Sequence, residues 1–207
     1  MDEKLKWLTW IKELQATAQV GHAYCKDEFC VARYERIGQI AAEIAADHSK
    51  ESFTRLIHIF GNEISYSTPK LDGRAVVFKD EKLLMVCEAD DGLWSLPGGW
   101  MDVNDSASES VEREVMEESG YLVKATKLLA FYDKHKHDHP PQWPHAYKCF
   151  FLCELKGGEP KLSMETTDIG FFEEDKLPEL SVDRITEKQI HRMFEHYRHP
   201  DWPTDFD

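Results

Sequence analysis

The sequence predicts an α/β domain preceded by a small all-helical domain, and two observations support this division. Apolar residues recur at helical spacing from the start of the chain to about Asn62, and no proline occurs before Pro69. Beyond this point, β-type runs, glycine-rich turns and an amphipathic helix alternate. We therefore expect a helical N-terminal domain over residues 1–66 and a larger domain over residues 67–207.

Three helices are expected in the first domain, with breaks at Gly21-His22 and at Asp47–Ser49. Each helix carries an apolar stripe. The stripes consist of Leu5, Leu8, Ile11 and Leu14, then Cys30, Tyr34, Ile37, Ala41 and Ile44, then Phe53, Leu56, Ile57 and Phe60. Short helices cannot bury such faces alone, so they must pack on each other, on the rest of the chain or on a second copy. We favour a second copy, which would make this domain a dimerisation element.

The larger domain begins with a predicted β-hairpin. Its strands are Arg74–Phe78 and Lys82–Cys87. A glycine-rich turn follows at Pro97–Gly99, and an amphipathic helix is expected from about Ser106 to Ser119. The remaining predicted elements are strands around Lys127–Tyr132 and Tyr147–Leu155 and a helix from about Thr186.

Composition narrows the class of protein. The chain has 207 residues, of which 42% are apolar and 12% aromatic, enough for a packed core. No apolar run is long enough to cross a bilayer, and the N-terminus Met1-Asp2-Glu3-Lys4 lacks the features of a signal peptide, so we expect a soluble cytoplasmic protein. The net charge of −14 disfavours general attraction to a nucleic-acid backbone. The five cysteines are expected to be reduced structural thiols.

Three glutamates on the amphipathic helix carry the predicted chemistry. Glu114, Glu117 and Glu118 stand three and four residues apart, so their side chains gather on one helix face. Clustered carboxylates repel one another unless cations neutralise them, and such oxygen ligands suit Mg²⁺ or Mn²⁺. Arg113 is placed to orient one glutamate, and Gly99 offers a main-chain carbonyl as a further ligand. The segment can therefore hold metal ions against a diphosphate and position an attacking water. The alternative is a solvated acidic helix face.

The full spacing around these glutamates resembles the signature of the Nudix hydrolases. That signature runs Gly, five residues, Glu, seven residues, then Arg-Glu-apolar-x-Glu-Glu-x-Gly-apolar. The matching positions are Gly99, Arg113, Glu114, Val115, Glu117, Glu118, Gly120 and Tyr121, preceded by Leu96-Pro97-Gly98. Asp105 stands where the signature has glutamate, which shortens the reach of that carboxylate by one methylene. The resemblance implies an α/β/α sandwich with a mixed sheet over residues 67–207.

By the same resemblance, the signature glutamates hold divalent metal and Arg113 orients them. The general base differs among family members and comes either from this helix or from a later loop. Glu165 and Asp168 lie in the region where many relatives supply a further acidic residue. A surface-loop role is the alternative for both residues.

A loop rich in histidine and lysine, residues 134–145, is the predicted recognition segment. It concentrates basic side chains in an otherwise acidic chain. Lys134, Lys136 or His139 could contact phosphate, and Trp143 could stack on a base. The alternative is a surface loop with incidental histidines, whose alternating positions give no fixed geometry for zinc. Further candidate substrate contacts are Arg74, Trp100 and Tyr132.

The layout of the whole chain is similar to that of a bacterial two-domain Nudix group that includes CDP-choline pyrophosphatases. Beside the helical domain, the likeness covers Thr68–Arg74, Trp94–Trp100, Gly170–Phe172 and Leu177–Ser181. It implies hydrolysis of CDP-choline to CMP and phosphocholine by a homodimer, with ADP-ribose as a competing substrate. Two other classes stay open. A non-catalytic nucleotide sensor is disfavoured by the intact glutamates, and an RNA exonuclease is disfavoured by the acidic charge.

Overall fold

Two compact units divide the chain in the computed structural model, which describes residues 6–49, 51–61 and 66–207. The first, the helical unit, covers Met1–Pro69 together with Trp143–His145. The second, the sandwich unit, covers Lys70–Gln142 and Ala146–Asp207. Leu5 and Asn62, which the sequence places in helices, lie outside the described residues. No helix in the described part is both long and apolar enough to cross a membrane.

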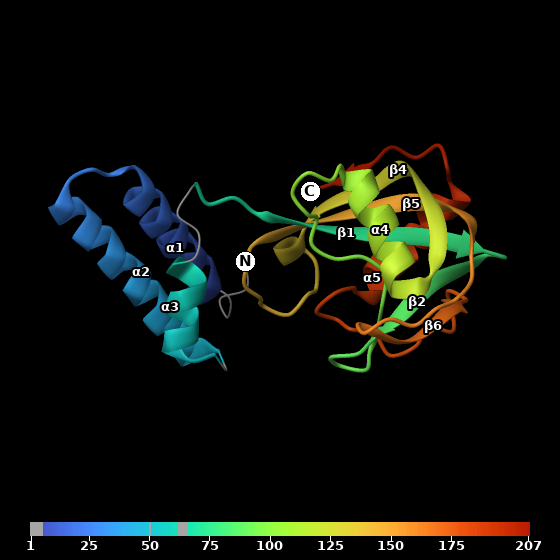
Figure 1. Ribbon diagram of the computed structural model, residues 1–207, viewed down its shortest axis with the longest axis horizontal. Coiled ribbons are helices and arrows are strands. Elements are labelled where there is room, and N and C mark those ends of the chain that lie inside the picture. Colours follow the sequence, from blue (N-terminus) through green and yellow to red (C-terminus); the bar gives the residue numbers. More distant parts are fainter. Residues whose placement is uncertain (1–5, 50, 62–65) are drawn as a thin grey trace. The chain divides into compact units, whose positions relative to one another are not determined.

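The helical unit consists of α1 (Lys6–Tyr24), α2 (Glu28–His48) and α3 (Phe53–Gly61) (Figure 1). Parts of the predicted stripes meet in one buried cluster, made of Ile11, Ala41, Ala42, Ala45, Leu56 and Phe60. The end of α2 at His48 confirms the second predicted break, where Ser49 is the C-cap. The three helices therefore share a small core of their own.

The predicted break at Gly21-His22 is wrong, because α1 continues to Tyr24. Gly21 is instead a position of close packing. A Cβ atom at this residue would overlap the ring of Tyr34 on α2. Glycine therefore lets the two helices approach each other and does not end the first one.

The sandwich unit is built on a mixed sheet. Its strands are β1 (Lys70–Lys79), β2 (Lys82–Glu88), β3 (Trp94–Ser95), β4 (Tyr121–Asp133), β5 (Ala146–Gly158), β6 (Thr166–Phe172) and β7 (Asp205–Phe206). Across the described residues the strand order is β3-β2-β1-β5-β4-β7, and β6 also pairs with β2. β1 lies antiparallel to β2 and parallel to β5, so the sheet is mixed as the resemblance implied. The predicted strands are confirmed, and most extend a few residues further than the pattern indicated.

Helices cover both faces of this sheet (Figure 1). α4 (Ala107–Ser119) packs on a cluster that includes Ala75 and Val77 of β1. α5 (Glu187–Arg198) packs on a second cluster, which includes Val76. Because side chains alternate between the two faces of a strand, β1 contributes to both cores. The fold is the expected α/β/α sandwich.

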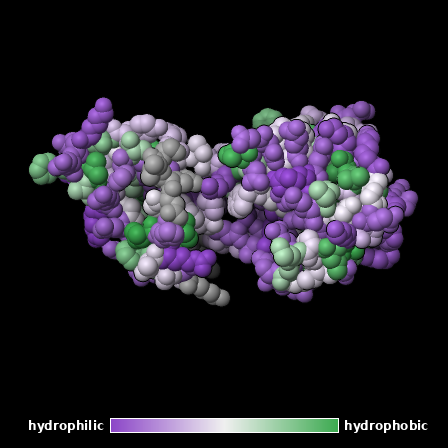
Figure 2. All heavy atoms as spheres, viewed as in Figure 1, coloured by the Kyte–Doolittle hydropathy of each residue, from purple (hydrophilic) through white to green (hydrophobic). Residues whose placement is uncertain are grey.

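Polar residues cover much of the sandwich unit on the face shown in Figure 2, where hydrophobic residues form small separate patches. A short 3₁₀ helix, η2 (Lys134–Lys136), opens the connection between β4 and β5. This connection and the segments that follow β2 and β6 supply many of the polar side chains of the candidate site.

Candidate active site

The helix that carries the signature glutamates, α4, has its ends fixed by local hydrogen bonds. Ser106 is its N-cap and forms a capping box with Glu109, in which each side chain accepts the backbone N–H of the other residue. The helix ends at Ser119, and its C-cap is Gly120, whose φ of 74° suits a residue without a Cβ atom. Val111 and Val115 pack against the sheet, and Glu118 lies next to them on the buried side of the helix. The caps and this packing together fix the direction in which the glutamates project.

The three signature glutamates differ in their surroundings. Glu118 is 5% exposed, and its Oε2 accepts a hydrogen bond from the Gly98 N–H at 2.8 Å. Glu114 is partly buried and lines the same polar pocket as Glu118. The side chain of Glu117 is 51% exposed and is not among the residues that line this pocket. The metal-binding and catalytic roles of Glu117 stay predictions.

Arg113 ties the glutamates to the loop that precedes α4. On the helix its Nη1 donates to Glu114 Oε1 at 2.9 Å and to Glu117 Oε2 at 3.2 Å. In the loop its Nη2 donates to Asp102 Oδ2 at 3.0 Å and its Nε donates to Asp105 Oδ2 at 3.2 Å. These contacts outweigh burial and raise the pKa of Arg113. Asp105, the departure from the signature, therefore reaches the arginine despite its shorter side chain.

The glycine-rich loop closes against β1. Gly98 has a φ of 131°, and a Cβ atom there would overlap the Gly73 carbonyl oxygen. The Gly99 carbonyl accepts a hydrogen bond from the Gly73 N–H at 2.8 Å. A carbonyl oxygen has two lone pairs, so this bond leaves one for a metal ion. The predicted ligand role of Gly99 is compatible with this geometry.

A polar pocket with a volume of about 540 Å³ lies within the sandwich unit. Its lining consists of Asp72, Arg74, Glu88, Asp90, Gly98, Gly99, Trp100, Asp102, Glu114, Glu118, Lys134, Gln142, Glu165, Asp183 and Arg184. The pocket thus brings together two signature glutamates, the Gly99 loop, the candidate base Glu165 and three candidate substrate contacts, Arg74, Trp100 and Lys134.

Carboxylates in this pocket are poorly solvated. Burial raises the pKa of Glu118 to about 8, against the opposing effects of Arg74 and the Gly98 N–H. Burial also raises the pKa of Glu114 and of Glu88 at the end of β2. Carboxylates in such surroundings bind a cation readily, and a set of hard oxygen donors suits Mg²⁺ or Mn²⁺. The donors present therefore fit the metal that the resemblance implies.

Among the described residues, three basic side chains line the pocket. Arg74 is buried, and its Nε donates to Asp72 Oδ1 at 2.7 Å. Lys134 donates to the side chain of Gln142, and burial lowers its pKa. Arg184 forms ion pairs with Glu88 at the end of β2 and with Asp90 and Asp91 just after it. The pocket therefore offers positive charge for phosphate oxygens as well as ligands for a metal.

Sequence reasoning missed Asp72, Glu88, Asp90, Asp102, Asp183 and Arg184, which also line the pocket. Glu88 carried a signal, because it is a charged residue at the end of the apolar run Leu83–Cys87. Arg184 carried none, since its Nη2 partner Asp90 lies 94 positions earlier in the chain.

Other predicted residues lie outside the pocket lining. His139 contacts the Val182 carbonyl oxygen at 2.8 Å and Gln189 Oε1 at 3.1 Å, and burial lowers its pKa to about 4. Trp143 belongs to the helical unit, where its ring packs against Phe60 with centroids 4.7 Å apart. Both side chains therefore have structural partners, and their contacts with substrate stay predictions.

The remaining candidates are also not among the lining residues. Tyr132 is buried and donates its hydroxyl to Asp205 Oδ2 at 3.0 Å. Lys136 is exposed on η2. Asp168, the second candidate base, is exposed on β6, and its Oδ1 accepts the Ile169 N–H at 2.8 Å. Glu165 is thus the candidate base that the structure brings to the glutamates of α4.

Two family models match the chain. Residues 5–60 match a domain described as a UDP-X-like, N-terminal oligomerisation domain, and residues 69–194 match the NUDIX domain. Among curated proteins, YjhB of Bacillus subtilis strain 168, provisionally named an ADP-ribose pyrophosphatase, is 42% identical over 98% of this chain and 97% of its own length.

Solved structures give a consistent result. An ADP-ribose pyrophosphatase of Streptococcus suis is 46% identical, covers 68% of this chain and 100% of its own, and superposes with a TM-score of 0.63. A UDP-X diphosphatase is 29% identical and covers 99% of both chains with a TM-score of 0.65. The likeness to the second structure extends over both units.

Proposed function

The chain belongs to the Nudix family, and from this premise we propose that it hydrolyses ADP-ribose to AMP and ribose 5-phosphate. The family and the relatives make it a pyrophosphatase acting on nucleoside diphosphates joined to a second group. The identification of ADP-ribose as the substrate goes one step beyond this class of reaction. It is supported by the names of the Bacillus subtilis and Streptococcus suis relatives.

One observation carries the proposal. Within a single pocket, the oxygens of Glu114, Glu118 and Gly99 occur together with the basic groups of Arg74 and Lys134. A diphosphate bound to a divalent cation needs both kinds of contact, because its oxygens bind the metal and also accept hydrogen bonds from basic side chains. The pocket volume of about 540 Å³ is in the range of pockets that hold small ligands.

The pocket lining favours a sugar over choline as the second group. A quaternary ammonium is recognised by a cage of aromatic rings, and Trp100 is the aromatic side chain that the described pocket offers. Carboxylates such as Asp90 and Asp183 accept hydrogen bonds from sugar hydroxyls. We therefore prefer ADP-ribose to CDP-choline, the substrate that the sequence alone favoured.

The residues of the pocket divide the work of hydrolysis. Glu114, Glu118 and the Gly99 carbonyl would hold Mg²⁺ or Mn²⁺, and such an ion polarises phosphoryl oxygens and neutralises their charge. Arg113 orients Glu114 through its hydrogen bond of 2.9 Å. The Gly98 N–H orients Glu118 through a hydrogen bond of 2.8 Å.

Glu165 is our candidate for the general base. Its N–H donates to Ser163 Oγ at 3.1 Å, and its carbonyl accepts the Ala89 N–H at 2.8 Å. The anchored main chain keeps an exposed carboxylate at the pocket, where it can take a proton from the attacking water. The charge of Glu165 also raises the pKa of Glu114, after the larger effect of burial, which agrees with their proximity.

The test is product analysis by liquid chromatography and mass spectrometry. The full-length protein is incubated with Mg²⁺ or Mn²⁺ and a panel of ADP-ribose, CDP-choline, NADH, nucleotide sugars and a short RNA. AMP with ribose 5-phosphate as the dominant products supports the proposal, and CMP with phosphocholine would replace the substrate. A preparation of Glu118→Gln made in the same way controls for contaminating enzymes.

The same panel separates the other classes. Turnover of RNA alone would make the protein a nuclease. Binding of nucleotides without turnover would make it a sensor. Both outcomes would overturn the proposed activity.

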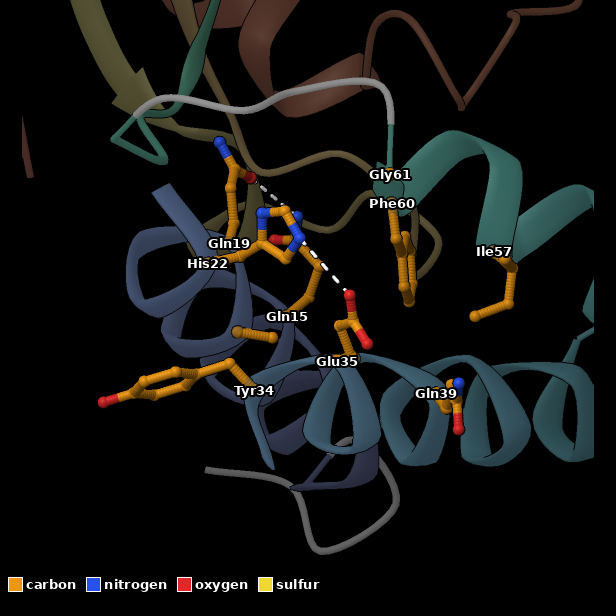
Figure 3. Close-up of a pocket in the computed structure, with 11 residues that line it drawn as sticks. Gln15, Gln19, His22, Tyr34, Glu35, Gln39, Ile57, Phe60 and Gly61 are labelled. Atoms are coloured by element: carbon orange, nitrogen blue, oxygen red, sulfur yellow. Dashed lines mark hydrogen bonds and ion pairs between the residues drawn. The ribbon is translucent and has the colours of Figure 1, made fainter. Parts of the chain in front are cut away.

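We further propose that the helical unit forms a homodimer contact. A mainly apolar hollow of about 240 Å³ lies among its helices (Figure 3). The labelled lining residues are Gln15, Gln19 and His22 of α1, Tyr34, Glu35 and Gln39 of α2, and Ile57, Phe60 and Gly61 of α3. Trp10 and Phe29 of the same unit are 56% and 77% exposed, and residues 5–60 match a domain described as an N-terminal oligomerisation domain. A monomeric mass by light scattering would contradict this role.

A further inference from the structure

A buried charge network lies beneath the pocket on the sheet. Asp72 on β1 and Lys148 on β5 are directly opposite each other in the parallel strand pair. Lys148 is 0% exposed, and its Nζ donates to Asp72 Oδ2. Asp72 Oδ1 in turn accepts the Arg74 Nε–H at 2.7 Å. Arg74 lies two residues after Asp72 on the same face of β1, so one carboxylate binds both cations.

The remaining donors of Arg74 show which way it faces. Its Nη1 donates to Ser95 Oγ at 3.1 Å and to the Leu96 carbonyl at 3.0 Å. Within the described chain, Nη2 has no hydrogen-bond partner, and Arg74 lines the pocket. Three buried contacts thus hold Nε and Nη1 of the guanidinium, which leaves Nη2 available to a ligand.

The carboxylates of the pocket compete for this arginine. The charges of Glu118 and Glu88 both act on Arg74, after the larger effects of burial and of Asp72. An arginine without its Nε partner could turn towards these carboxylates, since its side chain is long and flexible. An ion pair with Glu118 would then occupy a metal ligand and remove a phosphate contact at once.

Stability alone gives little reason for such a network. Buried ion pairs contribute little net stability, because desolvation of the charges offsets their attraction, and apolar residues of similar size often replace them without loss. Burial also lowers the pKa of Lys148 to about 7, although Asp72 opposes this effect. The position of a lysine in this buried site is therefore better explained by its effect on the side chains that it contacts than by a gain in stability.

We propose that Asp72 and Lys148 are positioning residues that hold the Arg74 Nη2 group towards the diphosphate of the substrate and keep the guanidinium away from Glu118. Asp72 fixes the guanidinium through Nε, and Lys148 fixes Asp72 and balances its charge. The inference rests on the proposed hydrolysis of a nucleoside diphosphate. It assigns to Asp72 and Lys148 the role of orienting Arg74 so that Arg74 can bind the diphosphate group.

The test removes the pair and asks whether Arg74 loses its effect. The double variant Asp72→Leu/Lys148→Met replaces both charges by apolar side chains of similar size. We expect KM for ADP-ribose to rise about tenfold to hundredfold, because a contact present in both ground and transition state is lost, and kcat to fall as well, because the released Arg74 pairs with Glu118. Arg74→Met should give a similar rise. The triple variant should be no worse than either, because all three changes remove one contact.

A matched control separates this role from general damage to the strand. Glu154→Leu/Lys156→Met makes the same substitutions in an exposed ion pair on β5 and should leave KM unchanged. Should the buried double variant fail to fold, Asp72→Asn keeps the size and an oxygen for Arg74 Nε, and we expect a rise in KM of severalfold. A KM near the wild-type value in a folded variant, or additive effects in the triple variant, would overturn the proposal.

A binding measurement keeps this test independent of the proposed activity. Calorimetric titration with ADP reports the diphosphate contact without turnover. If wild-type protein hydrolyses no nucleotide, the proposed function fails, and ADP still decides the role of the pair. Weaker ADP binding in both Arg74→Met and the double variant supports positioning, and unchanged binding in the double variant refutes it.

Discussion

The substitution Glu118→Gln should abolish turnover while it stabilises the metal-free protein at alkaline pH. Both effects have one origin. Glu118 is 5% exposed, and its carboxylate has the Gly98 N–H as a hydrogen-bond donor at 2.8 Å. Glutamine keeps an oxygen that can accept this bond, but it carries no charge to hold a divalent cation.

The size of the stabilising effect follows from the pKa of the buried group. Burial raises the pKa of Glu118 from 4.5 to about 8. A group whose pKa is higher in the folded chain contributes stability that is present below the unfolded value and lost as the pH rises through the folded value. At about 1.4 kcal/mol per pH unit, this interval corresponds to about 5 kcal/mol. We halve this free energy to about 2–3 kcal/mol, because water that enters the open pocket partly solvates the carboxylate. Glutamine does not ionise, so the variant avoids the loss.

Differential scanning calorimetry in EDTA measures this difference. At about pH 8.5 we expect the variant to melt about 5–10 °C above wild type, since about 1 kcal/mol shifts Tm by about 2–4 °C in a chain of this size. At about pH 4.5 the two proteins should melt together. Glu117→Gln is the matched control on the same helix, because its half-exposed side chain stays in water. A Glu118→Gln protein that melts at or below the wild-type temperature at both pH values would refute the reasoning, and full turnover would refute the metal role.

Three further outcomes are expected. Arg113→Lys keeps the positive charge but loses the several hydrogen bonds that the guanidinium makes to the loop and to the helix. We therefore expect kcat/KM in steady-state assays to fall about tenfold to hundredfold, with little change in Tm. An unchanged kcat/KM would contradict the orienting role of Arg113. Gly98→Ala places a methyl group against the Gly73 carbonyl, so urea unfolding should show a loss of about 2 kcal/mol or more. The affinity for Mg²⁺, measured by calorimetric titration, should rise between about pH 6 and pH 8.5, because Glu118 must lose its proton before it binds the ion. Equal affinities at the two pH values would contradict this expectation.

The parts of the fold that local rules govern could be predicted from the sequence. The N-cap Ser106 and the end of α4 at Ser119 fall where capping chemistry and apolar spacing place them. The Nudix signature lies on this one turn and helix, so the spacing of its residues is sufficient to identify the family without knowledge of the contacts between strands. The predicted helix break at Gly21 failed, because a glycine that ends a helix and a glycine that permits close packing have the same local signal.

The contacts that complete the pocket could not be predicted, because they join distant parts of the chain. Lys148 meets Asp72 across 76 positions, through the parallel pairing of β1 and β5. No spacing rule relates such residues. His139 shows the opposite case: its basic surroundings in sequence suggested a phosphate contact, whereas the fold surrounds it with hydrogen-bond partners from a distant segment.

The local capping of α4 has a consequence for how such enzymes diversify. The turn and helix over residues 97–120 form a nearly self-contained unit, whose geometry depends on its own caps and on the sheet beneath it. The residues that we expect to meet the rest of the substrate, such as Asp90, Lys134 and Asp183, come from separate connections elsewhere in the chain. Descendants of one ancestor can therefore exchange these connections, and with them the compound they consume, while the hydrolytic helix is inherited unchanged. In a new lineage, the short motif therefore identifies the reaction, whereas the substrate has to be inferred from the loops.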